Sequence, residues 1–175
     1  MATAPPIPNS FDLQKALQRA RQIEWMFFDV DGVMTDGGLY YGAQGESFKR
    51  FNVLDGYGLK ALKAAGLRIG ILSGRQHAAT EVRARELGFD VVIQGASNKG
   101  ETFDRLLSDY RLSGAVCGHM GDDSPDLEMF SRVHFAAAVP NAVDAVLAKA
   151  HWISRRPGGQ GAVRECCDFI LGSRA

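Results

Sequence analysis

The stretch "FFDVDGVMTDGG", residues 27–38, places three aspartates, Asp29, Asp31 and Asp36, directly behind an apolar run. The run begins with Trp25 and Met26 and is apolar enough to be a buried strand, so the carboxylates stand at the end of that strand. Burying an unpaired negative charge is costly, and a cation or a proton is therefore expected beside them.

Outward from this strand, segments of strand and helix length alternate along the chain. We expect strands at 24–29, 67–72, 90–93, 115–120, 133–138 and near 152, and helices at 56–65, 76–87, 99–111, 124–131 and 141–149. Ser10 is expected to cap a further helix that runs to Ile23, behind a loose, Pro-rich segment at 1–9. Strands separated by such helices form a parallel sheet covered on both faces. The sequence therefore predicts a doubly wound α/β fold, as a single domain over 1–175.

Composition narrows the possible partners. The 175 residues include 20 Lys and Arg against 20 Asp and Glu, so nothing favours nucleic acid or an anionic membrane surface. No apolar stretch is long enough to cross a bilayer, and no signal peptide is evident. Cys117, Cys166 and Cys167 form no CxxC pair and are odd in number. They are expected to be reduced, buried thiols of a cytoplasmic protein.

One segment breaks the alternation. Residues 38–53, "GLYYGAQGESFKRFNV", hold two β-rich runs around a Gly-Ala-Gln-Gly turn and predict a hairpin. Its aromatic residues Tyr40, Tyr41, Phe48 and Phe51 need burial, which a subunit interface would supply. We therefore expect a flap beside the acidic cluster, although a hairpin that decorates the sheet edge is the alternative.

Polar residues follow the strands at the end where open α/β sheets bind ligands. The residues expected to meet there are Asp29 and Asp31, Ser73 to Arg75, Lys99, and Asp122, Asp123 and Asp126. Carboxylate oxygens suit a hard cation such as Mg²⁺, which a substrate phosphate usually completes. For Asp36 and Asp126 taken singly, a capped turn or a solvated surface acid is an equally good interpretation.

Four motifs in this order, DxDGVxTDG, SGR, Lys and GDDxxD, resemble the haloacid dehalogenase superfamily over about residues 24–170. The resemblance implies that Asp29 is a nucleophile that forms an aspartyl-phosphate and that Asp31 protonates the leaving oxygen. It further implies that Ser73 and Lys99 hold the phosphoryl group. Mg²⁺ would be bound by the Asp29 carboxylate, the Asp31 backbone carbonyl and Asp122, with Asp123 or Asp126 as support.

The residues make chemical sense in these roles. Side chains two residues apart point to opposite sides of a regular strand, so the chain must bend after Asp29, which Gly32 permits. Asp29 can then attack phosphorus, while Asp31 gives a proton to the alcohol and later takes one from water. Lys99 neutralises the acids and the phosphate oxygens.

The expected substrate is small. The segments between Asp31 and Ser73 and between Ser73 and Lys99 hold only core elements and the hairpin, so no cap domain is expected. Capless members of the superfamily act on macromolecules or borrow a lid from a neighbouring subunit. The neutral net charge and the hairpin favour a borrowed lid.

Local motifs narrow the resemblance to one branch. "FNVLDGYG" at 51–58, "SGR" at 73–75, "QGASNK" at 94–99 and "GGQGAVRE" at 158–165 resemble capless phosphatases of an eight-carbon sugar-acid phosphate. Such enzymes are cytoplasmic homotetramers that serve lipopolysaccharide synthesis. The substrate contacts implied are Asp31, Asn52, Val53, Leu54, Asp55, Gly56, Lys60, Arg75, Arg83 and Lys99.

Two of these contacts have a physical argument of their own, because a guanidinium pairs bidentately with a carboxylate of the kind a sugar acid carries. They are Arg75 and Arg83, although for Arg83 a helix-surface salt bridge is nearly as good an interpretation. Lys60 departs from the arginine of the branch, so its contact is the least supported.

Three other functions remain open. A phosphatase of a nine-carbon sugar-acid phosphate shares the capless fold, but Arg75 and "DGYG" favour the eight-carbon acid. A phospho-accepting signalling domain would gain nothing from the acid at Asp31. An inactive binding module would not need the motifs intact.

The C-terminal segment, about 157–175, is predicted to be a mobile gate. Pro157 and three glycines suggest a hinge, and beyond it apolar residues recur at helical spacing from Val163 to Leu171. The gate would carry Arg164 to an anionic ligand in its own or a neighbouring subunit. The alternative is a frayed chain end.

Overall fold

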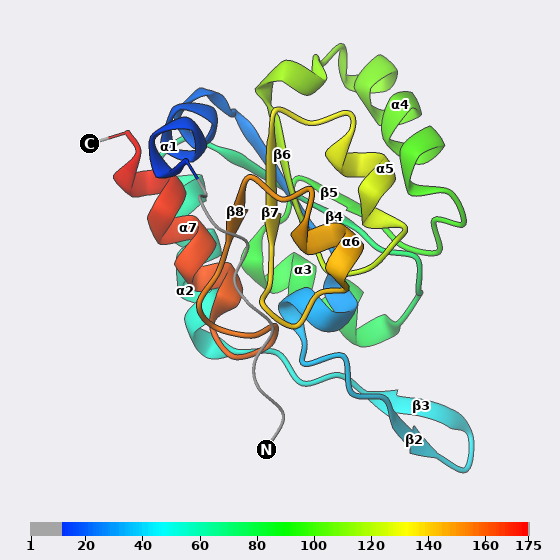
Figure 1. The fold of residues 1–175 in the computed structure, drawn as a ribbon. Coiled ribbons are helices and arrows are strands. Elements are labelled where there is room, and N and C mark those ends of the chain that lie inside the picture. The colour runs from blue at the N-terminus through cyan, green and yellow to red at the C-terminus, as the bar shows by residue number, and fades with distance from the viewer. Residues whose placement is uncertain (1–11, 175) are drawn as a thin grey trace.

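The computed structural model describes residues 12–174 and contains a six-stranded, wholly parallel sheet in the order β5-β4-β1-β6-β7-β8 (Figure 1). Its strands are β1 (Trp25–Phe28), β4 (Arg68–Leu72), β5 (Val91–Ile93), β6 (Cys117–Gly121), β7 (Phe135–Ala138) and β8 (Trp152–Ile153). The strand order runs in opposite directions on the two sides of β1, which confirms the doubly wound α/β fold.

Helices cover both faces of this sheet. They are α1 (Leu13–Gln22), α2 (Val53–Ala64), α3 (Ala78–Leu87), α4 (Lys99–Tyr110), α5 (Asp126–Phe130), α6 (Asp144–Leu147) and α7 (Ala162–Gly172). In Figure 1, α1, α2 and α7 lie on one side of the strands, and α4, α5 and α6 lie on the other. Among residues 12–174, none of the helices combines the length and apolarity that crossing a bilayer requires.

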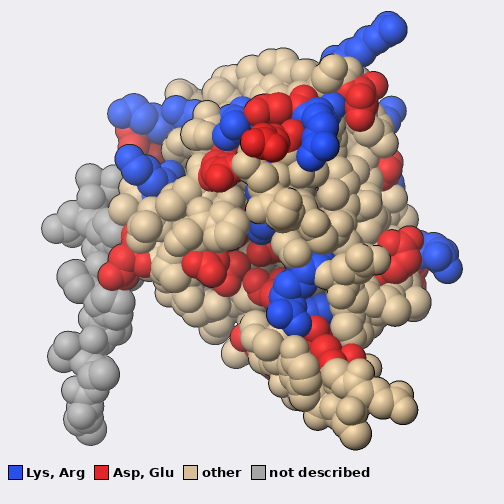
Figure 2. Space-filling view, turned by 90° about the vertical axis from the view of Figure 1, so that its right-hand side faces the viewer, with Lys and Arg blue, Asp and Glu red and all other residues tan. Residues whose placement is uncertain are grey.

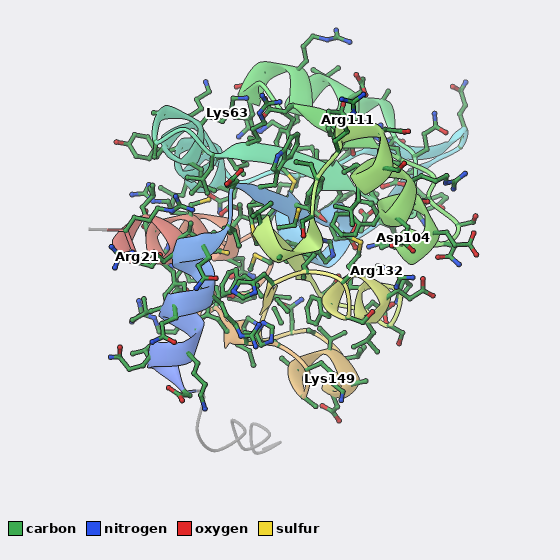
Figure 3. All side chains as sticks on the ribbon, turned by 90° about the horizontal axis from the view of Figure 1, so that it is seen from above. Arg21, Lys63, Asp104, Arg111, Arg132 and Lys149 are labelled. Carbon is green, nitrogen blue, oxygen red and sulfur yellow. The ribbon has the colours of Figure 1, made fainter. Side chains whose placement is uncertain are left out.

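The helix ends are fixed by local chemistry. Ser10 and the Pro-rich segment lie outside the described residues, and the cap of α1 is Asp12, whose carboxylate accepts a hydrogen bond from the Lys15 backbone N–H. On the opposite side of the molecule, Asp104 of α4 and Arg132, just past α5, form an ion pair of 2.9 Å that Figure 3 shows from above.

Strand β1 is the centre of the core, and all four of its residues are buried. Phe27 lies opposite Gly70 of β4, where a Cβ atom would stand only 2.4 Å from the Phe27 ring. On its other side the ring meets Phe103 of α4 edge-on, with centroids 5.3 Å apart. The glycine therefore gives the large ring of the central strand its space.

The second helix begins earlier than the sequence predicts. The expected helix covers 56–65, whereas α2 begins at Val53. The Asn52 side chain accepts a hydrogen bond from the Leu54 backbone N–H at 2.9 Å and so caps the helix.

The predicted hairpin is present and projects from the body of the molecule (Figure 1). It consists of β2 (Tyr40–Gly42) and β3 (Gly45–Phe48), which pair antiparallel. Tyr40 stacks on Phe48 with centroids 4.6 Å apart, yet Tyr41 and Phe48 remain 66% and 55% exposed. Within the described part of the chain, residues 12–174, Tyr41 and Phe48 are therefore largely uncovered.

The absence of a cap domain is confirmed for the described residues. Between Asp31 and Ser73 the chain forms only a turn, the hairpin, α2 and β4, and between Ser73 and Lys99 it forms only α3 and β5. Between Asp31 and Lys99, the hairpin is thus the one element added to the helices and strands of the core fold.

The C-terminal segment is a packed part of the fold. Helix α7 docks on α2 and α1 and buries Val163, Cys166, Cys167 and Ile170, so the amphipathic helix is confirmed and the frayed end is excluded. The preceding glycines are not a hinge. A Cβ atom on Gly158 would stand 1.8 Å from the Gly32 carbonyl oxygen, and the Gly159 N–H donates to the Val33 carbonyl at 3.0 Å. The glycines allow two backbone segments to touch, which flexibility does not explain.

Candidate active site

The strand ends converge on one cavity, as the sequence predicts. The cavity has a volume of about 380 Å³. Its lining residues are Asp29, Asp31, Ser73, Gly74, Arg75, Ala96, Ser97, Lys99, Asp122, Asp123, Pro125 and Asp126. Figure 2 shows acidic and basic side chains side by side on this side of the molecule, just above the projecting hairpin.

The chain bends sharply behind β1. Gly32 has φ of +89°, in the left-handed region, and a Cβ atom there would stand 1.9 Å from an Asp122 carboxylate oxygen. The Thr35 hydroxyl braces the turn Val30–Met34 by donating to the Val30 carbonyl and accepting from the Gly32 and Gly37 N–H groups. Only glycine allows the turn to lie this close to Asp122.

Lys99 and Asp126 form the buried floor of the site. The Lys99 ammonium lies 2.9 Å from Asp29 and 2.7 Å from Asp126. His119, in the middle of β6, lies 2.7 Å from the same oxygen of Asp126. The other oxygen of Asp126 accepts the N–H groups of Asp122 and Asp123 at 3.0 and 3.2 Å. Asp126 therefore shapes the loop after β6 and is not a solvated surface acid.

Of the two candidates for supporting the metal site, the geometry favours Asp126. The Asp123 side chain instead accepts a hydrogen bond from the Ser124 N–H at 2.7 Å. Sequence reasoning missed His119, because a histidine inside an apolar strand gives no signal of its partner across the turn.

Burial and mutual repulsion act on the pKa values of the three carboxyl groups in this cluster. Burial, reinforced by Asp29 and Asp126, raises the pKa of Asp122 to about 8. Burial and Asp126 raise the pKa of Asp29 too, against the effect of Lys99. Asp126 behaves in the opposite way: burial opposes its charge, but His119 and Lys99 outweigh burial and lower its pKa.

The donor set fits a hard divalent cation. Carboxylate oxygens of Asp29, Asp122 and Asp126 lie within 4.8 Å of one another. Asp29 Oδ1 and Asp122 Oδ1 are buried and have no hydrogen-bond partner, whereas both oxygens of Asp126 are already engaged. Two buried carboxyl oxygens without partners are the kind of donor that a hard cation binds. Asp29 and Asp122 are therefore the ligands that the geometry supports.

Asp31 lies at the other edge of the cavity and meets the base of the hairpin. Its Oδ1 accepts a hydrogen bond from the Lys49 ammonium, and the Arg75 guanidinium lies 3.7 Å from its Oδ2. Glu46 of β3 binds both cations, at 2.9 Å to Lys49 and 2.7 Å to Arg75. Sequence reasoning missed Lys49 and Glu46, since nothing local indicates that the returning strand reaches Asp31.

Several predicted residues lie elsewhere in the single chain. Asp36 pairs with Arg50 at 2.8 Å and accepts the Gly38 N–H, so it caps a turn. Arg83 pairs with Glu86 at 2.8 Å and donates to the Asn52 carbonyl at 3.3 Å. The helix-surface salt bridge, the alternative for Arg83, is thus present. Lys60 is exposed on α2 and does not line the cavity.

Residues 52–56 form the N-terminal cap and the first turn of α2, and Asp55 is buried beneath α7. The Asp55 carboxylate accepts the Arg164 backbone N–H at 2.8 Å and so caps α7, whose own cap residue Gly161 has no side chain. The Arg164 side chain turns away, to Asp168 at 2.8 Å and over the Tyr57 ring. Arg164 is therefore not directed at the cavity.

Comparison with known proteins places the chain in a family. The model of the haloacid dehalogenase-like hydrolases matches residues 88–163. The 3-deoxy-D-manno-octulosonate 8-phosphate phosphatase KdsC of Yersinia pestis is 41% identical over 89% of this chain and 83% of its own length. The KdsC of Escherichia coli K12 is 36% identical over 89% and 82%.

A solved structure agrees. The 3-deoxy-D-manno-octulosonate 8-phosphate phosphatase of Moraxella catarrhalis, crystallised with a magnesium ion, a phosphate ion and KDO, superposes with a TM-score of 0.89 at 37% identity. The match covers 92% of each chain. The chain belongs to the haloacid dehalogenase-like hydrolases, in the branch formed by the KdsC phosphatases.

Proposed function

We propose that this chain is a Mg²⁺-dependent phosphatase that hydrolyses 3-deoxy-D-manno-octulosonate 8-phosphate to the free sugar acid and phosphate. The observation that carries the proposal is the arrangement of two aspartates in separate surroundings at the bend that follows β1. Asp29 is buried against Lys99, and Asp31 stands apart from it at the cavity edge, held by Lys49. This arrangement supports nucleophilic attack by Asp29 and proton transfer by Asp31.

The proposed reaction has two halves. A carboxylate oxygen of Asp29 attacks phosphorus and forms an aspartyl-phosphate, while the departing sugar oxygen takes a proton from Asp31. Asp31 then takes a proton from water, and the resulting nucleophile attacks phosphorus and releases Asp29. Ser73, buried at the end of β4, and Lys99 hold the phosphoryl oxygens throughout.

Mg²⁺ is proposed to be bound by the Asp29 and Asp122 carboxylates and the Asp31 backbone carbonyl. The unpartnered oxygens of Asp29 and Asp122 and the raised pKa of Asp122 support this assignment. When bound, the cation neutralises the carboxylates and the charge of the phosphoryl group. Asp126 keeps the loop that carries Asp122 in place.

Substrate recognition is proposed to rest first on Arg75, which lines the cavity and can pair with the carboxylate of the sugar acid. The other contacts proposed, Asn52 to Gly56, Lys60 and Arg83, do not line the cavity within one chain. They would have to act across a subunit boundary.

We further propose a single-domain subunit, a homotetramer and a cytoplasmic site of action in lipopolysaccharide synthesis. The exposed aromatic residues of the hairpin support an assembly in which it covers a neighbouring site. Three free, buried cysteines fit a reducing compartment.

A comparison of two substrates tests the proposal. With Mg²⁺, phosphate release from the eight-carbon ester should exceed release from a nine-carbon sugar-acid 9-phosphate, because Arg75 is matched to the shorter acid. A preference for the nine-carbon ester would make the chain the sister phosphatase. Phosphate transfer only from a phosphoprotein would support the signalling domain instead.

A further inference from the structure

The hairpin brings a buried cation, Lys49, against the active-site residue Asp31, and this cation belongs to none of the motifs. Lys49 directly follows β3, and its side chain is only 2% exposed. Its ammonium meets two carboxylates, Asp31 and Glu46. A lysine is almost never buried without paired acids, and these two carboxylates compensate the buried charge of Lys49.

The two oxygens of Asp31 differ in their surroundings. Oδ1 is bonded to Lys49, whereas Oδ2 is buried beside Arg75 and has no hydrogen-bond partner. The Arg75 guanidinium lies 3.7 Å from Oδ2, and the Arg75 side chain is 44% exposed. One oxygen is anchored and the other is uncommitted.

We propose that Lys49 is a positioning residue that holds the Asp31 carboxyl so that its uncommitted oxygen exchanges the proton with the substrate. This role rests on the proposed phosphatase function. When the bond between phosphorus and the sugar oxygen breaks, its electron pair stays on that oxygen, which takes the proton from Oδ2. An Asp31 without its anchor would rotate, and correct placement of an acid determines most of its effect.

The neighbours of Lys49 are accounted for by this single role. The ammonium is shared between Asp31 and Glu46, and Lys49 does not line the cavity. Glu46 extends the same arrangement to Arg75. The flap therefore contributes to catalysis through Asp31 and does more than cover the site.

The test uses two esters that differ in their need for an acid. A sugar-acid phosphate has an alkoxide leaving group that requires a proton, whereas p-nitrophenolate leaves without one. Lys49→Met should lower kcat/KM about 10- to 100-fold on the sugar ester, a part of the roughly 10²–10⁴-fold effect typical of acid–base catalysis. On p-nitrophenyl phosphate the loss in kcat/KM should stay below about threefold, because this leaving group gains little from an acid. Lys49→Arg should restore part of the lost rate.

A matched control comes from the next residue. Arg50 also ties the hairpin base to the turn after β1, but through Asp36. Arg50→Met should leave unchanged the ratio of kcat/KM on the sugar ester to kcat/KM on p-nitrophenyl phosphate. If it shifted the ratio as Lys49→Met does, general loosening of the hairpin would explain both variants, and Lys49 would have no special role.

A double-mutant cycle isolates the pair of residues. In an Asp31→Asn background, Lys49→Met should cause no further loss on the sugar ester, because the carboxyl that it positions is absent. Independent losses, or equal losses on both esters, would overturn the proposal. A wild-type chain that releases no phosphate with Mg²⁺ would instead refute the phosphatase function itself.

Discussion

Arg75, the proposed contact for the substrate carboxylate, already has a carboxylate partner within the chain. Its guanidinium lines the cavity but is paired with Glu46 at 2.7 Å. The carboxylate of a sugar acid would have to replace that of Glu46, which is a like-for-like exchange. Arg75 can therefore contribute selectivity at little cost in lost contacts.

Arg75→Ala should affect the sugar-acid ester far more than p-nitrophenyl phosphate. Loss of a hydrogen bond to a charged group costs about 1.5–3 kcal/mol, or roughly one to two orders of magnitude in kcat/KM. Steady-state kinetics on the two esters measures the difference. An equal loss on both would mean that Arg75 serves the phosphate or the hairpin.

Asp55 gives a prediction about pH and stability. Burial beneath α7 raises the pKa of this carboxyl to about 6, although the Arg164 N–H, Arg83 and Arg156 favour its charged form. The folded chain therefore holds this proton at pH values where the unfolded chain has released it. The contribution of Asp55 to stability is complete below about pH 4 and is lost as the pH rises to about 6.

Over this window the free energy of unfolding should fall by up to about 3 kcal/mol through Asp55. Asp55→Asn should remove this fall. Urea unfolding at intervals from about pH 4 to about pH 7, compared for both chains, measures it. If the free energy of unfolding changed with pH in the same way for the wild-type chain and for Asp55→Asn, the assignment would be contradicted.

At the scale of elements, the end of the chain is where composition misleads. Pro157 and the glycines after it predict a flexible link, and the structure uses the same glycines for contact with the turn after β1. A sequence cannot distinguish a glycine that bends freely from one that admits a neighbouring backbone, because the neighbour is distant in sequence.

Stopping the chain after Arg156 should therefore abolish cooperative folding and not only change kinetics. The truncation removes α7 and uncovers the face of α2 on which it docks. Each large buried apolar side chain contributes about 1.5–3 kcal/mol, and a whole domain has a margin of about 5–15 kcal/mol.

Thermal unfolding followed by circular dichroism measures this effect. A chain that stops after Gly172 keeps α7 and is the control, which should unfold cooperatively. A folded Arg156 truncation with altered kcat and KM would restore the idea of a gate.

Most of the fold and the centre of the site could be predicted from local sequence, for a physical reason. Buried parallel strands are continuous apolar runs, and their carboxyl ends meet at one edge, so strand order along the chain is enough to group Asp29, Ser73, Lys99 and Asp122. The start of α2 was missed although Asn52, with Asp55 three residues on, is a capping signal. The roles of Lys49 and His119 could not be found, since their partners depend on the path of the hairpin and of the loop after β6.

At the scale of the whole molecule, the hairpin should govern assembly. Phe48 is 55% exposed on the hairpin, and Leu13 is 54% exposed on α1, away from it (Figure 1). In a tetramer held by the hairpins, Phe48→Glu should yield smaller species, whereas Leu13→Glu should not. Light scattering on a sizing column measures this. An unchanged mass for both variants would place the interface elsewhere.

The central claim is that Asp29 and a bound Mg²⁺ together cleave the phosphate ester, and one assay tests it directly. Phosphate release from 3-deoxy-D-manno-octulosonate 8-phosphate is measured for the wild-type chain with Mg²⁺, for the same chain with a chelator, and for Asp29→Asn with Mg²⁺. Circular dichroism confirms that each sample is folded. Release should occur only in the first sample, because the second lacks the cation that Asp29 and Asp122 bind and the third lacks the nucleophile. Substantial release by folded Asp29→Asn, or by the chelated wild type, would contradict the account.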